Sequence, residues 1–321
     1  MLRLFDRASV FFTIFFMLPF LVACEEGQST LKVGTNVWTG YEPLYLAEAL
    51  SAYGASAVQL TQYPSASDVI RAYKNKEIDA AALTLDEVLL MKSEGFDSKV
   101  VLVMDFSAGG DVIIARQGIN SLKELGRNKI GAEATALGAF VLCRAAQMEN
   151  LNCLDFNVAN MEVNEHEDAF KSQEVAAVVT FEPVRTKLLT AGGKIIFDSR
   201  SIPGEIIDVL TVNPNVLQKQ DKNLNILLTG WFKALDYLRS SRHDAVKKMS
   251  TRQHISAEEF ETSLSGIHIP SHEENKDLFN GKKLKQSAEN LREILLKSNL
   301  MKNSVGISDL FVAEPIGSVN P

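Results

Sequence analysis

Cysteine and histidine are scarce in this sequence, which has three cysteines and five histidines among its 321 residues. The two histidines with a metal-like spacing, His268 and His272, have Ile269 and Pro270 between them, and this disfavours a single helix face for both rings. The sequence also has no nucleophile elbow and no phosphate-binding glycine loop. We therefore expect no metal site, no cofactor and no catalytic set.

Positive charge is also in short supply, with 33 lysines and arginines against 40 aspartates and glutamates and a net charge of −7. An acidic chain whose charges are spread evenly argues against nucleic acid as a partner. It equally argues against a polybasic patch that would attract the protein to a membrane surface.

A long hydrophobic run is missing as well. The apolar run at residues 8–20 is shorter than the roughly 20 residues that a membrane helix needs. Arg3 and Arg7 precede this run, and LVAC follows at residues 21–24. The pattern predicts a signal peptide at 1–23, and its end resembles the bacterial lipobox, which implies lipidation of Cys24 and a flexible tether over 24–30. The alternative is a chance apolar N-terminus.

The other two cysteines, Cys143 and Cys153, would meet in an oxidising compartment only if the chain folds back sharply. Cys143 belongs to a predicted helix at 136–149, and Cys153 lies just beyond its end. A disulfide is one reading of the pair. We favour the other, which is two separate buried thiols.

Short apolar strands alternate with amphipathic helices along most of the chain. This alternation predicts an α/β fold with largely parallel sheets and helices on both faces. No strand is expected in the last hundred residues. The predicted strands are 31–36, 57–61, 78–83, 99–105, 111–115, 129–133, 156–162, 175–180, 194–198 and 206–212, and the helices are 43–53, 66–75, 85–94, 136–149, 165–172, 183–191, 225–240, 256–264 and 283–298.

The alternation breaks at residues 107–111 and resumes with a fresh set of strands and helices. We expect two lobes with two hinge crossings, because the helical C-terminal part cannot make a sheet of its own. Lobe I is 31–108 plus 210–310, lobe II is 109–209, and 311–321 is a tail. The predicted hinge is Gly109, Gly110 and Asp111, since glycine permits backbone angles that other residues tolerate poorly.

Several stretches carry a family likeness: VGTNVWTGYEPLYLA from residue 33, DVIRA from 68, IDAA from 78, GAEAT from 131, TFEP from 180 and IHIPSHEEN from 267. Together they resemble the periplasmic solute-binding proteins of ABC importers, in the branch that handles nitrate, sulfonates, taurine and the pyrimidine precursor of thiamine. The resemblance implies two lobes that close on a small molecule outside the strand ends. A fungal pyrimidine synthase shares the fold but carries a cysteine cluster that this chain lacks, so we expect no enzyme.

An aromatic residue, a glutamate and a proline occur together twice, at Tyr41-Glu42-Pro43 and at Phe181-Glu182-Pro183. Proline suits the first turn of a helix, but glutamate is not a preferred cap. We therefore expect both rings and both carboxylates to converge on a cationic group, where cation–π contact contributes up to about 2 kcal/mol. The alternative is a family habit at helix entries that relatives with anionic ligands share.

Strand-to-helix turns line the cleft in such a fold, and they supply the remaining candidates. Asp86 has a second explanation, because Thr84 and Glu87 have capping-box spacing, and Trp38 has one in packing between the lobes. Free N–H groups at helix N-termini near Thr84 and residues 135–138 would suit an anion instead, and a zwitterion would satisfy both readings. The candidate ligand-binding residues are Trp38, Tyr41, Glu42, Thr84, Asp86, Phe106, Ser107, Glu133, Thr135, Phe181, Glu182 and Asp208.

Two roles follow from the resemblance and the expected leader. One is a monomeric lipoprotein on the periplasmic face of a bacterial membrane, which delivers a solute to an ABC permease. The other is a ligand-sensing lipoprotein that contacts a membrane signalling protein. Both roles need the same closing cleft, because a ligand that bridges two lobes favours the closed state.

Overall fold

The computed structural model describes residues 29–54, 56–133 and 137–319. The predicted signal peptide, Cys24 and Thr135 lie outside these ranges. Within them, no helix combines the length and the apolar content that crossing a membrane requires.

The first sheet has six strands in the order β11-β4-β10-β3-β1-β2. β1 pairs in parallel with β2 and β3, while β10 runs antiparallel to β3 and β4. The central strands β3 and β10 are buried at every position, which explains why their sequences are mostly apolar. The strands are β1 Leu31–Thr35, β2 Val58–Gln62, β3 Ala80–Thr84, β4 Lys99–Ser107, β10 Ile207–Val212 and β11 Ile267–His268.

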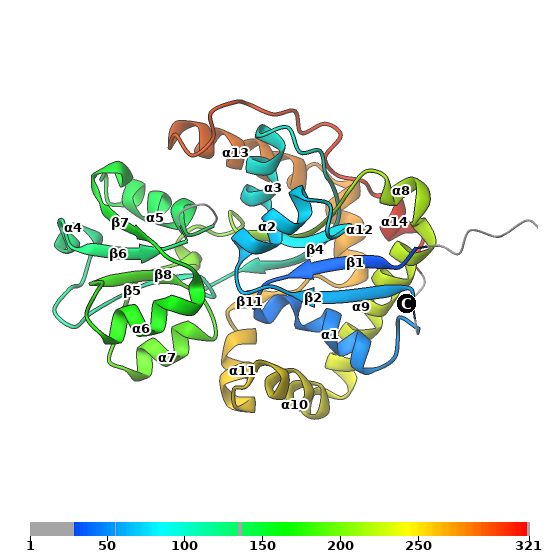
Figure 1. Cartoon of the computed structure of the whole chain (residues 1–321), viewed down its shortest axis with the longest axis horizontal. Coiled ribbons are helices and arrows are strands. Elements are labelled where there is room, and N and C mark those ends of the chain that lie inside the picture. The colour runs from blue at the N-terminus through cyan, green and yellow to red at the C-terminus, as the bar shows by residue number, and fades with distance from the viewer. Residues whose placement is uncertain (1–28, 55, 134–136, 320–321) are drawn as a thin grey trace, which may run out of the picture.

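Helices cover both faces of this sheet (Figure 1). Figure 1 shows α2, α3 and α13 on one face and α1, α9, α10 and α11 on the other. The helices of this part are α1 Glu42–Ala49, α2 Ala66–Lys74, α3 Leu85–Ser93, α8 Val216–Lys219, α9 Asp221–Ser240, α10 Arg242–Gln253, α11 Ala257–Leu264, α12 His272–Asn280, α13 Lys283–Lys297 and α14 Glu314–Gly317, with the 3-10 turn η1 at Thr39–Tyr41.

The second sheet has five strands in the order β7-β6-β8-β5-β9, with helices on both faces (Figure 1). The chain enters it directly from β4 into β5 and leaves it from β9 into β10. Its elements are β5 Val112–Ala115, α4 Leu122–Leu125, β6 Lys129–Ala132, α5 Leu137–Met148, β7 Asn157–Asn160, α6 His166–Lys171, β8 Ala177–Thr180, α7 Val184–Thr190 and β9 Lys194–Asp198, with 3-10 turns η2 Cys153–Asp155, η3 Val163–Glu165 and η4 Ser199–Ser201.

The predicted α/β class is confirmed, and each sheet is mixed rather than wholly parallel. The two strands that follow the crossings account for this, because β5 and β10 run antiparallel to both of their neighbours. The last hundred residues do contribute a short strand, β11, which pairs with β4. The helices α10 and α12 escaped prediction because their sequences are strongly polar, and tertiary packing overrides weak periodicity.

The expectation of two separate thiols is wrong, because Cys143 and Cys153 form a disulfide. The sharp return that this requires begins where α5 ends, and Asn150 there adopts a left-handed conformation at φ 56°. Asparagine tolerates that region better than most residues. The reversal brings the two Cα atoms to 4.8 Å.

The segment predicted as a tail packs against the first sheet over its described residues. Phe311 bridges in parallel to Val100, on β4. Ile316 and Val319 are buried in the same apolar core. This segment therefore covers the core beside α9 and α12.

Candidate functional site

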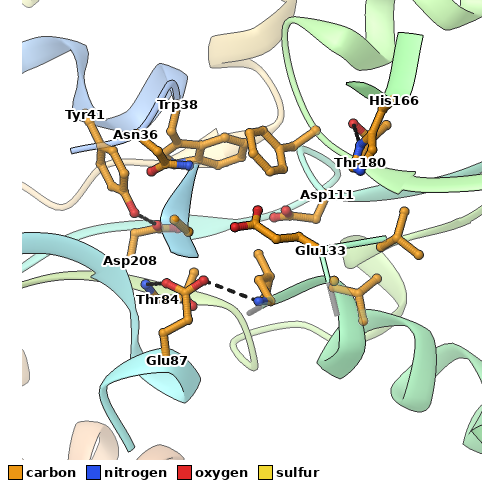
Figure 2. Close-up of a pocket in the computed structure, with 16 residues that line it drawn as sticks. Asn36, Trp38, Tyr41, Thr84, Glu87, Asp111, Glu133, His166, Thr180 and Asp208 are labelled. Atoms are coloured by element: carbon orange, nitrogen blue, oxygen red, sulfur yellow. Dashed lines mark hydrogen bonds between the residues drawn. The ribbon is translucent and has the colours of Figure 1, made fainter. Parts of the chain in front are cut away.

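A cavity lies between the two sheets and receives side chains from both of them (Figure 2). In this closed arrangement it offers about 40 Å³ to water-sized occupants, well below the 300–1,000 Å³ of sites for drug-sized ligands. It therefore suits a small solute. The lining residues are Asn36, Trp38, Tyr41, Ala66, Thr84, Glu87 and Asp208 from the first lobe, and Asp111, Glu133, Leu137, Gly138, Val141, His166, Val179, Thr180 and Phe181 from the second. Asp208 was predicted within lobe II, but its strand β10 belongs to the first sheet.

The topology explains why these residues meet. Asn36 directly follows β1, and Thr84 is the last residue of β3. Asp208 lies near the start of β10, which is antiparallel to β3 and pairs Asp208 with Thr84. The three residues therefore share one edge of the sheet, the edge at which open α/β sheets bind ligands.

Six of the candidate ligand-binding residues line the cavity: Trp38, Tyr41, Thr84, Glu133, Phe181 and Asp208. Asp111, predicted as part of the hinge, also lines it. Thr135 cannot be placed, because it lies outside the described residues. The remaining candidates are Glu42, Asp86, Phe106, Ser107 and Glu182, and they are not among the residues that line the cavity.

The expected convergence of Glu42 and Glu182 is wrong. Glu42 accepts a hydrogen bond from Gln253 Nε2 at 3.1 Å and lies 3.5 Å from Arg252. Glu182 accepts from Arg185 Nη1 at 2.7 Å and also bonds to residues of its own helix. Each carboxylate is thus bonded inside its own lobe and neither residue lines the cavity, although Glu42 Oε2 is buried with no hydrogen-bond partner among the described residues.

Phe106 and Ser107 serve the crossings between the lobes. Ser107 Oγ bonds to Ser199 Oγ at 2.8 Å and accepts from the Asp111 amide at 3.2 Å. Phe106 stacks on His268, with ring centroids 6.3 Å apart. The Ser107 bonds hold β4 against the segment that follows β9, whereas the Phe106 ring packs against β11.

The predicted hinge glycines are needed for two different reasons. Gly109 has φ +114°, a conformation that side chains with a Cβ rarely adopt. At Gly110 the limit is space, because a Cβ there would lie 2.7 Å from the Trp38 ring. The Trp38 ring, which lines the cavity, thus packs directly against the backbone of the crossing at Gly110.

Aromatic rings close one side of the cavity. Trp38 from the first lobe meets Phe181 from the second edge to face, with centroids 5.6 Å apart and planes at 87°. Figure 2 shows Trp38 and Tyr41 among the labelled lining residues. Because Trp38 and Phe181 come from opposite lobes, the ring contact joins the two lobes.

Glu87 bonds to backbone amides of both lobes. Its Oε2 accepts from the Thr84 amide at 2.9 Å, at the start of α3, and its Oε1 accepts from the Leu137 amide at 3.3 Å, at the start of α5 (Figure 2). Burial, with Asp86 nearby, raises the pKa of Glu87 to about 8. Glu87 thus occupies one amide at each of the two helix starts, a kind of group that an anion would use.

Glu133 makes a second link between the lobes. Its Oε1 accepts from Ser67 at both the amide, 2.8 Å away, and the hydroxyl, 2.7 Å away. Ser67 lies on α2 in the first lobe, whereas Glu133 follows β6 in the second. Burial raises the pKa of Glu133.

Asp111 and Asp208 add two more buried carboxyls. The Tyr41 hydroxyl donates to Asp208 Oδ1, and Asp111 Oδ2 has no hydrogen-bond partner among the described residues. Burial raises the pKa of Asp111 to about 7, and burial together with nearby Asp105 raises the pKa of Asp208 well above its usual value. Each raised pKa reflects a carboxylate that lacks a compensating cation.

Positive charge does not balance these acids. No lysine or arginine is among the described residues that line the cavity. His166 has Nδ1 at 3.2 Å from Thr180 Oγ1 and Nε2 at 3.3 Å from the Met161 carbonyl. Burial lowers the pKa of His166 to about 4, so this ring is neutral at physiological pH. Over the described residues, no cluster of three or more His, Cys, Asp or Glu side chains has a geometry that could hold a metal ion.

Sequence reasoning missed Glu87 as a lining residue, although its capping-box spacing was visible. It also missed Asn36, which follows β1, and Thr180, which precedes Phe181, although both positions at strand ends signal cavity residues. The others lie on helices or on a strand of the second lobe, and only Leu137 and Gly138 had a local signal, the helix start at residues 135–138. They are Ala66, Leu137, Gly138, Val141, His166 and Val179.

Two α/β lobes, joined by two crossings around an enclosed cavity, define the fold of periplasmic binding proteins. The chain belongs to the NMT1-like family, whose model matches residues 25–253. The resemblance seen in the sequence is confirmed. Among curated proteins, none matches the chain.

Several solved structures with the same fold are binding proteins, and some of these belong to ABC transport systems. One is the zinc-bound ligand-binding component of an ABC-type import system from Staphylococcus aureus, with 16% identity and a TM-score of 0.76 over 91% of this chain and 99% of that one. Another is the alkanesulfonate-binding protein SsuA from Xanthomonas axonopodis pv. citri bound to MOPS, with 12% identity and a TM-score of 0.75 over 88% and 98%. The desulfurization enzyme DSZB also matches, with 12% identity and a TM-score of 0.63 over 89% and 98%.

Proposed function

We propose that the protein is an extracytoplasmic solute-binding protein that captures a small solute with a positively charged or N–H-donating group and delivers it to an ABC permease. The observation that carries the proposal is the composition of the cavity wall. Asp111, Glu133 and Asp208 line it from both lobes, and no described lysine or arginine faces them. A cationic group between the lobes would compensate charges that are costly to bury alone.

The rings of the cavity support the same chemistry. Trp38, Tyr41 and Phe181 all line it. A cation over a desolvated aromatic ring gains up to about 2 kcal/mol. One amide at each of the two helix starts, Thr84 and Leu137, is bonded to Glu87, and a sulfonate or nitrate would also meet the buried acids of the wall. A zwitterion remains compatible only if its anionic end reaches another wall.

A matched set of small solutes tests the proposal. Ethylamine, taurine and ethanesulfonate share a two-carbon frame and differ in charge. We expect ethylamine to raise the melting temperature most, taurine less and ethanesulfonate not at all, because binding to the native state alone stabilises it. A shift with ethanesulfonate and none with ethylamine would replace this proposal with an anion-binding function.

The proposed role in transport, rather than in sensing, rests on the family and on the transport proteins that share the fold. The genes beside this one distinguish the two roles. Permease and ATPase genes support transport, whereas a gene for a membrane-bound signalling enzyme with no permease gene supports the sensing alternative.

We also propose that Cys24 carries a lipid anchor on the periplasmic side of the membrane. Its support is the LVAC sequence behind a short apolar run with Arg3 and Arg7 upstream. Serine at position 24 lacks the thiol that would carry the lipid. We therefore expect Cys24→Ser to leave the membrane fraction, because stable anchoring needs two or more acyl chains. Unchanged processing and unchanged membrane association of Cys24→Ser would refute the anchor.

A further inference from the structure

Two aspartates lie side by side where β4 and β10 pair at the floor of the cavity. Asp105 on β4 is the cross-strand partner of Asp208 on β10. Directly opposed residues of antiparallel strands place their side chains on the same face, with Cβ atoms about 4.5–5.5 Å apart. Burial raises the pKa of both carboxyls, and the charge of Asp105 raises that of Asp208 further, because two neighbouring buried acids disfavour ionisation of both.

Each carboxyl also receives one bond from a ring of the cavity wall. Trp38 Nε1 donates to Asp105 Oδ2 at 3.0 Å, and the Tyr41 hydroxyl donates to Asp208 Oδ1. Asp105 is fully buried, and Asp208 is 3% exposed and lines the cavity. Trp38 and Tyr41 thus hold the two carboxyls in place by hydrogen bonds. Of the two aspartates, Asp208 is the one that a solute in the cavity can reach.

The backbone above this pair is shaped to fit it. A Cβ at Gly40, in η1, would lie 1.8 Å from Asp105 Oδ2 and 2.6 Å from Trp38 Nε1. Only glycine lets η1 pass this close. Glycine at residue 40 therefore lets the backbone of η1 pack directly over Asp105.

The charged groups around the pair are all acidic. Asp111, on the crossing into β5, raises the pKa of both carboxyls, and Glu87 on α3 raises the pKa of Asp208. No lysine, arginine or histidine is among the described groups that act on either pKa. Two buried carboxyls in contact without a cation cannot both ionise near neutral pH, and their titrations belong to the pair rather than to one residue.

We propose that Asp105 and Asp208 share one proton in the ligand-free protein and that the positive group of the solute takes the place of this proton on binding. In this exchange the shared proton passes to solvent, and an N–H of the solute donates to Asp208. The total charge of the pair and its bound cation is then unchanged. Trp38 keeps Asp105 in place behind it. This inference rests on the proposed function for its second half only.

A third carboxyl, that of Asp111, also favours a cationic solute in the cavity. Asp111 Oδ2 lacks a hydrogen-bond partner among the described residues, is buried, and lines the same cavity (Figure 2). A solute with two N–H donors would meet Asp208 on the first lobe and Asp111 on the second. Asp208 and Asp111 together therefore select solutes that are positively charged near neutral pH and have at least two N–H groups, such as a primary ammonium.

Infrared difference spectroscopy tests the shared proton without any ligand. Wild type is compared at pH 7 with Asp105→Asn and Asp208→Asn, and Asp309→Asn, a surface aspartate paired with Lys99, is the control. We expect each of the first two variants to lose the same protonated-carboxyl band, whereas the control retains it. A band that persists in both variants, or that disappears in only one, would overturn the shared proton.

Calorimetric titration with ethylamine tests the exchange. At pH 7, titrations of wild type in two buffers with different ionisation enthalpies report the protons released on binding. We expect close to one proton released by wild type and none by Asp105→Asn, whose amide donates to Asp208 in place of the proton. Binding by wild type without proton release would overturn the exchange. No binding of ethylamine, with the infrared bands as expected, would overturn the exchange and the proposed function but leave the proton pair standing.

Discussion

The two aromatic-Glu-Pro turns have nearly the same sequence and place their rings alike, but they use their glutamates differently. Tyr41 and Phe181 both line the cavity. Glu42 bonds to a glutamine on distant α10, whereas Glu182 bonds to residues in the first turn of its own helix, α7. In both copies of the motif the ring lines the cavity, and the glutamate does not.

Helical geometry explains why a ring and the neighbouring acid cannot both face the cavity at the first turn. Tyr41 and Glu42 both have right-handed helical backbone angles. With 3.6 residues per turn, neighbouring side chains point about 100° apart. Once Tyr41 faces the cavity, Glu42 must point elsewhere. The charge of the site comes instead from strand ends, at Asp208 and Asp111.

The largest difference that we expect between the two turns is in the free energy of unfolding, and it comes from Glu182 in the second lobe. Glu182→Ala removes the acceptor of Arg185 Nη1 and of the Thr186 amide and hydroxyl. Because one partner of a mostly buried ion pair is then left alone, we expect the free energy of unfolding to fall by about 3 kcal/mol. Urea denaturation measures it.

Glu167→Ala is the matched control, because Glu167 pairs with Lys171 and Lys187, both about half exposed. Such surface pairs contribute less than about 1 kcal/mol. Equal unfolding midpoints for Glu182→Ala and the control would contradict a structural role for Glu182.

In the first lobe the effect depends on pH. Burial raises the pKa of Glu42 to about 7, so between about pH 4.5 and 7 the native state binds more protons than the unfolded state. Wild-type stability therefore falls as pH rises through this window. Glu42→Gln lacks this loss, and we expect it to match wild type at pH 5 and to exceed it by roughly 2–3 kcal/mol at pH 8. Thermal melts at the two pH values measure the difference, and a gap that does not change with pH would refute this account of Glu42.

A smaller effect separates the rings. Tyr41→Phe removes the hydroxyl that donates to Asp208, whereas Phe181 has no such group to lose. We expect Tyr41→Phe to lower the free energy of unfolding at pH 7 by about 1–2 kcal/mol, as measured in urea. A loss below about 0.3 kcal/mol would mean that this hydrogen bond does not matter to the native state.

The fold was predictable because apolar strands and amphipathic helices alternate so regularly. The strand-to-helix turns also pointed to Thr84, which lines the cavity. The direction in which each side chain points was not predictable. No local pattern shows that Glu42 turns toward α10, because that contact joins residues 211 positions apart. The same holds for Glu87, whose spacing explained only its cap on Thr84 and not its bond to Leu137 in the other lobe.

The most direct test of the central claim is the affinity for the tightest binder among ethylamine and taurine, measured by calorimetry at pH 8. At that pH Asp111, with a pKa of about 7, is ionised. We predict that Asp111→Asn weakens binding more than tenfold, because losing one member of a buried charge pair costs about 2–5 kcal/mol. Glu42→Gln and Glu182→Gln should stay within about threefold of wild type, since both acids bond inside their own lobes. The opposite result, an unchanged Asp111→Asn and a large loss in either glutamate variant, would contradict the account.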